Sequence, residues 1–396
     1  MTRAILGLSL AVLFFFAYLT GIRPAFTLVY VLIAIFAVAW VWPRLLAGRI
    51  RVERHIDAGQ PTVGEPFEES FLVEKRTWVP APWVEIRDAG RVAGYQPGRL
   101  LSLGRHPQRW NARGVYPNRG WLTFGPTRVR VAEPFGLFSH EQKVGERFEV
   151  LVYPRIQPMP ELLTPADQHA GDAPRYGAWA DYPPETGGVR EYAPGDSFGR
   201  IHWPLSIKHG SLMSKTFEQP LTADLWIVLD LHGGVHFGDG PESTLEYSIS
   251  LAASIAMQVH GRGRMVGLIA NDSRGTLLEP HRAVRQDRVV LDYLAIASAD
   301  GRAPLASSSI WDRVRRLPRR ALAVITPSND SRWVHSLQGA RQRSTAVLVF
   351  YMDATSFGAP DREFGLELGS EADLYVIRKG DDFSRLMRTR DAIRLG

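Results

Sequence analysis

Residues 223–231 read ADLWIVLDL, a run dominated by large apolar side chains that is typical of a strand buried on both faces. Residues 242–260 follow it with Leu245, Ile249 and Ala256 on one helical face. Strand-like and helix-like segments then alternate to the end of the chain. This alternation predicts a doubly wound α/β domain with a parallel sheet over residues 222–396. The predicted strands are residues 223–231, 264–270, 321–326, 346–351 and 373–377, and the predicted helices are residues 242–260, 286–297, 330–342 and 381–394.

Residues 50–155, which precede this domain, have a sequence pattern typical of β-strands. Apolar and polar residues alternate in four runs, residues 67–75, 83–88, 127–131 and 147–152. Glycine and proline turns separate these runs, and the pattern predicts an antiparallel β-sandwich of immunoglobulin-like architecture. Residues 156–221 are rich in proline and glycine, and they predict a surface connector between the two domains.

Two uncharged apolar runs, residues 4–20 and 25–42, begin the chain. As helices they would be roughly 26–27 Å long, just sufficient to cross the hydrocarbon core of a bilayer. They predict a transmembrane hairpin over residues 1–45 with a tight loop at residues 21–24. A signal peptide followed by a buried helix is the alternative.

Arginines are distributed unevenly around the predicted hairpin. Arg44, Arg49, Arg51 and Arg54 follow the second apolar run, whereas the hairpin loop carries Arg23. The positive-inside rule therefore places both chain ends in the cytoplasm. The sequence thus predicts a multi-pass protein of the cell (inner) membrane, with the lipid bilayer as a partner and the folded domains in the cytoplasm.

The composition excludes several classes of protein. The 396 residues include no cysteine, which excludes disulfides, a thiol nucleophile and zinc sites built on sulfur. The net charge of +6 is too dilute to indicate nucleic-acid binding. A Walker A loop, an H-E-x-x-H motif and a glycine-rich dinucleotide fingerprint are all missing from the sequence. We therefore expect no cofactor, no small-molecule substrate and no nucleic acid.

Residues 188–218 read GVREYAPGDSFGRIHWPLSIKHGSLMSKTFE and carry the most distinctive pattern in the chain. The Pro-Gly-Asp sequence at residues 194–196 predicts a turn, and Arg190 and Arg200 on either side can bind carboxylates. Two interpretations remain open. The first is a structural clasp, in which the aspartate of the turn pairs with one of these arginines above a packed Trp203. The second is a docking surface for a partner.

The segment resembles the signature of the bacterial family known as domain of unknown function 58. The matching positions are Arg190, Tyr192, Pro194, Gly195, Asp196, Arg200, Trp203, Lys215 and Glu218. Further motifs that look like those of the family lie upstream, at residues 119–120, 124–126, 133–138 and 152–154. Pro204 and His209 depart from the family pattern. The resemblance implies paired N-terminal membrane helices and a non-catalytic interaction protein, which acts with a MoxR-type AAA+ ATPase in the assembly or maturation of other proteins.

An enzyme is the alternative class. Residues 195–199, Gly-Asp-Ser-Phe-Gly, match the G-x-S-x-G nucleophile elbow of hydrolases, with Ser197 or an acidic residue of the segment as the reacting group. The elbow works between a buried strand and a helix, and we expect Pro204 to interrupt any helix there. A hydrolase would also need a base, such as His202 or His232, within hydrogen-bonding distance of its nucleophile. We therefore expect no enzymatic activity.

The α/β region resembles von Willebrand factor A domains, whose ion site uses D-x-S-x-S after the first strand and a T-D-G turn after a later one. Asp230 is present here, but His232 and Gly234 stand in place of the two serines, and Pro327 follows Thr326. A hard cation needs several oxygen ligands. The resemblance therefore implies a degenerate domain with Asp230 as a residual candidate ligand. We expect no bound magnesium, and a structural role for Asp230 at the strand end.

Overall fold

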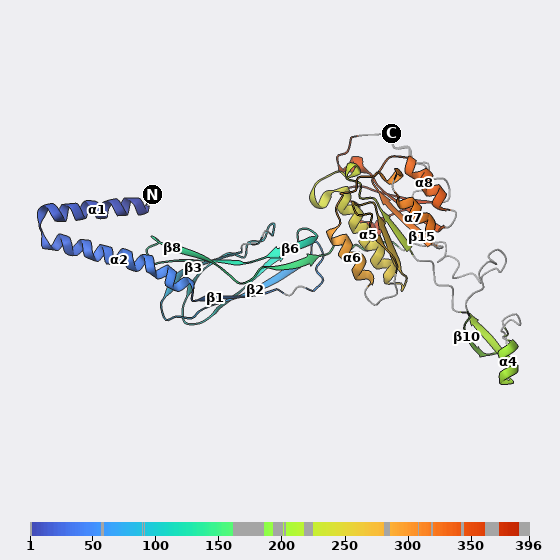
Figure 1. Cartoon of the computed structure of the whole chain (residues 1–396), viewed down its shortest axis with the longest axis horizontal. Coiled ribbons are helices and arrows are strands. Elements are labelled where there is room, and N and C mark those ends of the chain that lie inside the picture. Colours follow the sequence, from blue (N-terminus) through green and yellow to red (C-terminus); the bar gives the residue numbers. More distant parts are fainter. Residues whose placement is uncertain are drawn as a thin grey trace. The chain divides into compact units, whose positions relative to one another are not determined.

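The computed structural model forms two compact units, Met1–Arg155 and Ile156–Gly396. The first unit begins with two helices and continues as antiparallel sheets, and the second contains a short strand pair and a mixed α/β sheet (Figure 1). The structure describes residues 2–56, 59–88, 90, 92–160, 186–192, 201, 203–217, 225–280, 286–307, 309–317, 320–341, 344–360 and 372–387.

Two apolar helices, α1 (Thr2–Thr20) and α2 (Arg23–Ala47), begin the chain and contact each other (Figure 1). Gly21 lies between them with a φ of +64°, a conformation that glycine adopts without steric strain. The chain therefore reverses within two residues, where the sequence predicted a loop of four.

The second helix, α2, is longer than the predicted run of residues 25–42. It continues through Pro43 to Ala47. Among the described residues, α2 is the helix that is long and apolar enough to cross a membrane, with a mean hydropathy of 2.4 over its most apolar window. The apolar part of α1, Gly7–Thr20, is shorter.

The remainder of the first unit consists of antiparallel sheets. Its strands are β1 (Ile50–Ile56), β2 (Pro66–Lys75), β3 (Ala81–Asp88), β4 (Arg99–Leu103), β5 (Gln108–Val115), β6 (Gly120–Phe124), β7 (Thr127–Ala132), β8 (Ser139–Val144) and β9 (Phe148–Val152). They pair in the orders β1-β2-β5, β4-β3-β7-β8 and β6-β9. The four predicted runs correspond to β2, β3, β7 and β9. The first two sheets share one core, which includes Phe71, Val84 and Val131.

The last turn of α2 belongs to the core of these sheets. Leu46 and Ala47 are buried in the core that the two larger sheets share, and α2 contacts β7 and β8. The side-chain amide of Gln142 on β8 donates to the carbonyl of Ala47. Because β1 begins at Ile50, the helix enters the β domain almost without a linker.

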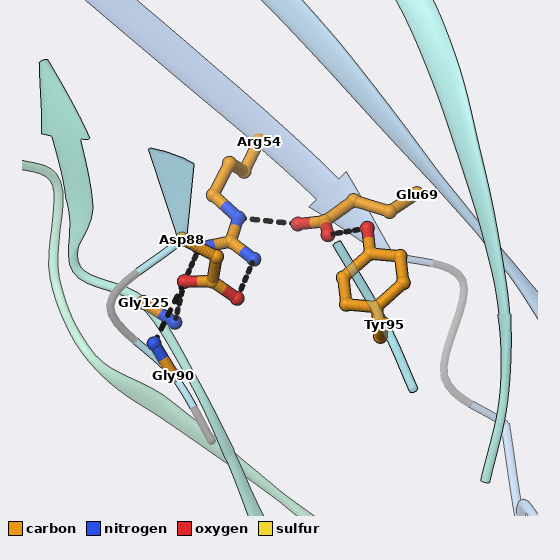
Figure 2. A network of polar contacts seen from close by, with 6 residues as sticks. All are labelled: Arg54, Glu69, Asp88, Gly90, Tyr95 and Gly125. Atoms are coloured by element: carbon orange, nitrogen blue, oxygen red, sulfur yellow. Dashed lines mark hydrogen bonds and ion pairs between the residues drawn. The ribbon is translucent and has the colours of Figure 1, made fainter. Parts of the chain in front are cut away.

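Arg54 of β1 is buried with two carboxylates (Figure 2). Its Nε donates to Glu69 of β2, and its two Nη atoms donate to Asp88 of β3 at 3.0 and 3.1 Å. Burial alone would lower the pKa of Arg54, but the hydrogen bonds and charges of Glu69 and Asp88 outweigh it and raise the pKa. The arginine that the sequence analysis assigned to the membrane boundary is therefore an internal ion-pair partner.

The same network fixes two loops of the β domain. Oδ1 of Asp88 accepts from the amides of Gly90 and Gly125, at 3.0 Å each (Figure 2). The hydroxyl of Tyr95 donates to the remaining oxygen of Glu69. Burial and the adjacent Glu69 carboxylate raise the pKa of Tyr95, so its hydroxyl stays protonated.

The predicted connector, residues 156–221, contains regular structure. β10 (Thr186–Glu191) pairs antiparallel with β11 (Met213–Phe217), and α4 (Trp203–His209) lies between them in the sequence. The expectation that Pro204 interrupts a helix here is wrong. Pro204 occupies the first turn of α4, where an amide N–H has no helical partner to lose.

The rest of the second unit is a mixed sheet with helices on both faces (Figure 1). Its strands are β12 (Leu225–Leu229), β13 (Val266–Ala270), β14 (Leu277–Leu278), β15 (Arg320–Thr326), β16 (Ser344–Met352) and β17 (Asp373–Ile377), and its helices are α5 (Thr244–His260), α6 (Gln286–Ile296), α7 (Ile310–Arg316) and α8 (Arg332–Arg341). Among the described residues the order is β14-β13-β12-β15-β16-β17. The strands are parallel as predicted, except that β14 runs antiparallel at the edge.

The predicted C-terminal helix, residues 381–394, does not form in its described part. Phe383–Arg385 is a single 3-10 turn, and Asp382 caps it by accepting from the Ser384 amide at 3.0 Å. Phe383 is buried, which fixes this turn to the domain. Residues 388–396 lie outside the described residues.

Replacing Arg54 tests the buried network. We expect Arg54→Met to lower the free energy of unfolding by about 3–5 kcal/mol, because it leaves two buried carboxylates without their cation. Arg51→Met on the same strand is the matched control. Arg51 is half exposed and pairs with Glu53, so its loss is expected to cost less than about 1 kcal/mol. Chemical denaturation of the detergent-solubilised protein measures both, and equal losses would contradict the structural role of Arg54.

Candidate functional site

Asp230 lies at the carboxyl edge of the α/β sheet, directly after β12. In an open α/β sheet, ligands bind outside the carboxyl ends of the strands, at the point where the strand order reverses. That point lies between β12 and β15 in this sheet. Thr326 is the last residue of β15, and Asn271 directly follows β13. These three polar side chains therefore meet where such sheets hold a ligand.

Asp230 is fully buried, and both of its carboxylate oxygens accept hydrogen bonds. Oδ2 accepts from Thr326 Oγ1 at 2.7 Å. Oδ1 accepts from Asn271 Nδ2 at 2.8 Å and from the His232 amide at 3.2 Å. Asn271 in turn accepts from the amide of Leu231. Through these hydrogen bonds the carboxylate links the ends of the adjacent strands β13, β12 and β15.

His236 packs behind this cluster. Its Nε2 lies 3.0 Å from the carbonyl oxygen of Asp230, and its Nδ1 lies 3.1 Å from Thr244 Oγ1. A carbonyl oxygen only accepts, so Nε2 carries the proton in the neutral ring. Burial dominates the electrostatics and lowers the pKa of His236, although Asp230 opposes the shift. The ring is therefore neutral at pH 7, and both of its nitrogens are engaged in holding the loop after β12.

The residues around Asp230 differ from an open cation site. Ser328 donates its amide to Thr326 Oγ1 at 2.9 Å, so the threonine hydroxyl both donates to Asp230 and accepts from the loop. Within the described part of the chain, no three histidine, aspartate or glutamate side chains are grouped to hold a metal ion. The lack of magnesium binding by Asp230 stays a prediction.

A cavity of about 410 Å³ lies beside Asn271. Arg302 and Arg313 line it, and so does Asp272. The carboxylate of Asp272 is engaged by Thr276 and by Tyr293, whose hydroxyl donates at 3.0 Å. The two guanidinium groups make this cavity more suitable for an acidic group than for a cation.

The structure describes part of the predicted signature. Pro194, Gly195, Asp196 and Arg200 lie outside the described residues, as does Glu218. Arg190 on β10 pairs in register with Ser214, and Lys215 on β11 pairs with Val189, so the two basic positions lie on adjacent pairs and on opposite faces of this ribbon. The Tyr192 amide donates to the Leu212 carbonyl at 2.8 Å and extends this ladder.

Trp203 begins α4 with 57% of its surface exposed. The clasp interpretation places Trp203 under the Pro-Gly-Asp turn; that turn lies outside the described residues, so the interpretation stays a prediction. Ile207 is 81% exposed, and side chains four residues apart lie on one face of a helix. The pair Trp203 and Ile207 therefore forms an exposed apolar surface. Ile207 was not among the predicted site residues, although its spacing of four from Trp203 indicates a shared helical face.

The strand that precedes the G-x-S-x-G motif differs from the strand that a hydrolase elbow requires. Ser197 and His202 lie outside the described residues, so the geometry of the motif itself is not described. A strand, β10, precedes the motif and a helix, α4, follows it, which the sequence analysis did not expect. However, β10 pairs with β11 in a two-stranded antiparallel sheet, whereas the elbow requires a strand of the central sheet.

Two substitutions of Asp230 test its structural role. We expect Asp230→Ala to lower the free energy of unfolding on the order of 3 kcal/mol, since it leaves the buried donors of Thr326 and Asn271 and the partly buried His232 amide without this acceptor. Asp230→Asn keeps one acceptor oxygen and should lose less. Asp239→Ala is the control, because Asp239 is exposed and its side chain caps nothing. A magnesium-dependent rise in the melting temperature of the parent, absent from Asp230→Ala, would instead reveal a cation site.

Two solved structures that match parts of this chain give no fold assignment. The CARDB domain of the PF1109 protein from Pyrococcus furiosus, crystallised with di-metal ions, has 16% identity and a TM-score of 0.20, and the match covers 26% of this chain and 91% of that domain. A cycloisomaltooligosaccharide glucanotransferase from Paenibacillus sp. has 10% identity and a TM-score of 0.18, with 82% of this chain and 48% of the enzyme covered. Both TM-scores are too low to support an argument.

Sequence comparisons relate the chain to an uncharacterised protein and to a family of unknown function. The chain is 24% identical over 237 residues to the uncharacterised protein YeaD of Bacillus subtilis (strain 168), which corresponds to 60% of this chain and 58% of YeaD. The motifs at residues 119–154 lie upstream of the family match. The chain matches the family described as "Protein of unknown function DUF58" over residues 188–361, from β10 through β16.

Proposed function

We propose that this chain is a membrane-anchored, non-catalytic interaction protein. Its α4 surface docks a MoxR-type AAA+ ATPase that acts in the assembly or maturation of other proteins. The observation that carries the proposal is the exposed pair Trp203 and Ile207 within the signature segment. Large apolar side chains that stay exposed together are typical of protein-binding surfaces. The class of partner comes from the family resemblance.

The α2 helix supports the membrane anchor. Arg23 and Arg44 bracket an uncharged stretch of about 31 Å, close to the roughly 30 Å of a hydrocarbon core. The guanidinium of Arg44 lies 4.0 Å from the centre of the Trp40 ring and donates to the Trp40 carbonyl at 2.6 Å. Such a pairing of arginine and tryptophan is typical of the membrane–water interface. We further propose that α1 crosses beside α2, which gives a two-helix hairpin in the cell (inner) membrane.

The arginine distribution supports a cytoplasmic orientation. Arg54 is buried, which leaves Arg44, Arg49 and Arg51 near the end of α2 and Arg23 in the hairpin. Three arginines against one still favour both chain ends in the cytoplasm.

In this proposal the two folded domains act as scaffolds for the docking surface. We propose that the β domain is an immunoglobulin-like spacer and that the α/β domain is a degenerate von Willebrand A-like domain. The sheet order, with an antiparallel strand beside β13, is compatible with that fold. The hydrogen bonds of Asp230 favour a structural carboxylate in place of an ion ligand.

A reporter fusion tests the orientation. We expect a reporter fused after Gly396 to be active in its cytoplasmic form, because the arginines after α2 remain on the cytoplasmic side. Activity of alkaline phosphatase, which matures in the periplasm, would contradict this topology.

Substitution of the exposed pair tests the docking surface. We expect the double variant Trp203→Ala, Ile207→Ala to reduce capture of the purified ATPase at least about tenfold, as for central contacts of an interface. Its melting temperature should stay near that of the parent, since both side chains are exposed. The control is Trp121→Ala, which removes a 62% exposed tryptophan from the first unit. A folded double variant that captures the ATPase normally would exclude this surface.

A further inference from the structure

Residues 133–138, Glu-Pro-Phe-Gly-Leu-Phe, connect β7 to β8 and form an apolar loop. We call these residues the β7–β8 loop. Phe135 at its tip is 73% exposed, and Leu137 and Phe138 are half-buried. A loop on an ordinary protein surface is usually polar, so this composition calls for a physical explanation.

Every backbone N–H of the β7–β8 loop is bonded within the loop. The buried carboxylate of Glu133 accepts from the amides of Phe135, Leu137 and Phe138. The Gly136 amide donates to the Glu133 carbonyl at 3.0 Å, and the Glu133 amide donates to the Phe138 carbonyl at 3.3 Å. Residue 134 is proline and has no N–H. The loop therefore presents an apolar tip with no free amide donor.

The β7–β8 loop contacts α2 within the part of the helix that we propose spans the membrane. The ring of Phe138 meets the ring of Phe36 edge to face, with centroids 6.4 Å apart. Phe36 is eight residues before Arg44, or about 12 Å along the helix axis. If Arg44 marks the membrane boundary, Phe36 lies inside the hydrocarbon layer, and the loop that contacts it must extend there.

Other exposed aromatic residues surround the same end of the β domain. Trp83 pairs in register with Ala132, the residue before the loop, and is 51% exposed. Trp78 is 89% exposed in the turn after β2, where the Arg76 amide donates to the carbonyl of Arg49 at 2.8 Å, just beyond α2. Tryptophans grouped in this way are typical of the headgroup region of a bilayer.

We propose that the β7–β8 loop inserts its tip into the membrane leaflet from which α2 emerges. The inference rests on the proposed anchoring of α2, and it adds a second membrane contact on the folded domain. Backbone groups enter lipid only when they are hydrogen-bonded, and the Glu133 carboxylate meets this need for the amides of the loop. Insertion then removes the apolar surface of Phe135 and Leu137 from water, which is favourable.

Cysteine labelling can test the insertion, because the chain has no native cysteine. Four single variants of the full chain carry an environment-sensitive nitrobenzoxadiazole label: Phe135→Cys and Leu137→Cys in the loop, Tyr30→Cys in α2, and Trp121→Cys. Tyr30 is 64% exposed and reports on the anchor. Trp121 is 62% exposed on β6, beyond the opposite end of β7, and is the matched control. Each protein is reconstituted into phosphatidylethanolamine–phosphatidylglycerol vesicles with nitroxide-labelled phosphatidylcholine as the quencher.

We expect the labels at positions 135 and 137 to be quenched about as strongly as the label at position 30, and several-fold more than the label at position 121. Quenching at position 30 alone would overturn the insertion and leave the anchor intact. A blue-shifted label at position 135 that lipid nitroxides do not quench would mean that protein covers the loop, and would also overturn it. Absence of quenching at position 30 as well would remove the anchor and the insertion together.

Discussion

The β domain depends on one buried cation that lies between two carboxylates. Arg54 bonds Glu69 within its own sheet and Asp88 in the next (Figure 2). Its guanidinium also lies 5.6 Å from the ring centre of Phe148 in the third sheet. An isolated charge in such a position would be strongly destabilising, and so would either carboxylate without the arginine. Strands β1, β2 and β3, which carry Arg54, Glu69 and Asp88, must therefore meet in one arrangement. That requirement also fixes the loops at Gly90 and Gly125, whose amides complete the shell of Asp88.

Much of the fold could be predicted from local patterns, and the failures have local causes. The strands of the α/β sheet were found because strands covered on both faces are almost continuously apolar, as in β12 and β13. β1 was missed because its sequence, IRVERHI, has the charges of a segment that flanks a membrane. Its second arginine, Arg54, is neutralised by partners 15 and 34 residues away, which no local pattern reveals. α4 was missed because Pro204 was taken as an interruption, although a first helical turn tolerates proline.

The candidate sites, too, could be predicted from the sequence only in part. The strand-end position of Asp230 follows from the sequence, but its partners do not, because Asn271 and Thr326 are 41 and 96 residues away. The two exposed apolar surfaces stand on different kinds of backbone. Trp203 and Ile207 lie on a single short helix. The β7–β8 loop has already used its amides internally, which suits a solvent that cannot bond them.

The junction between α2 and β1 has a mechanical consequence. Two residues separate Ala47 from Ile50, and Leu46, Ala47 and Gln142 hold the end of the helix against the sheets. The helix therefore cannot rotate freely relative to the β domain. With α2 in a bilayer, the β domain would act as a lever arm, and a sideways pull on it would reach the membrane as a torque on the helix. The lipids around the helix would then resist the tilt through the mismatch it creates, so that work done on the folded domain becomes strain in the bilayer.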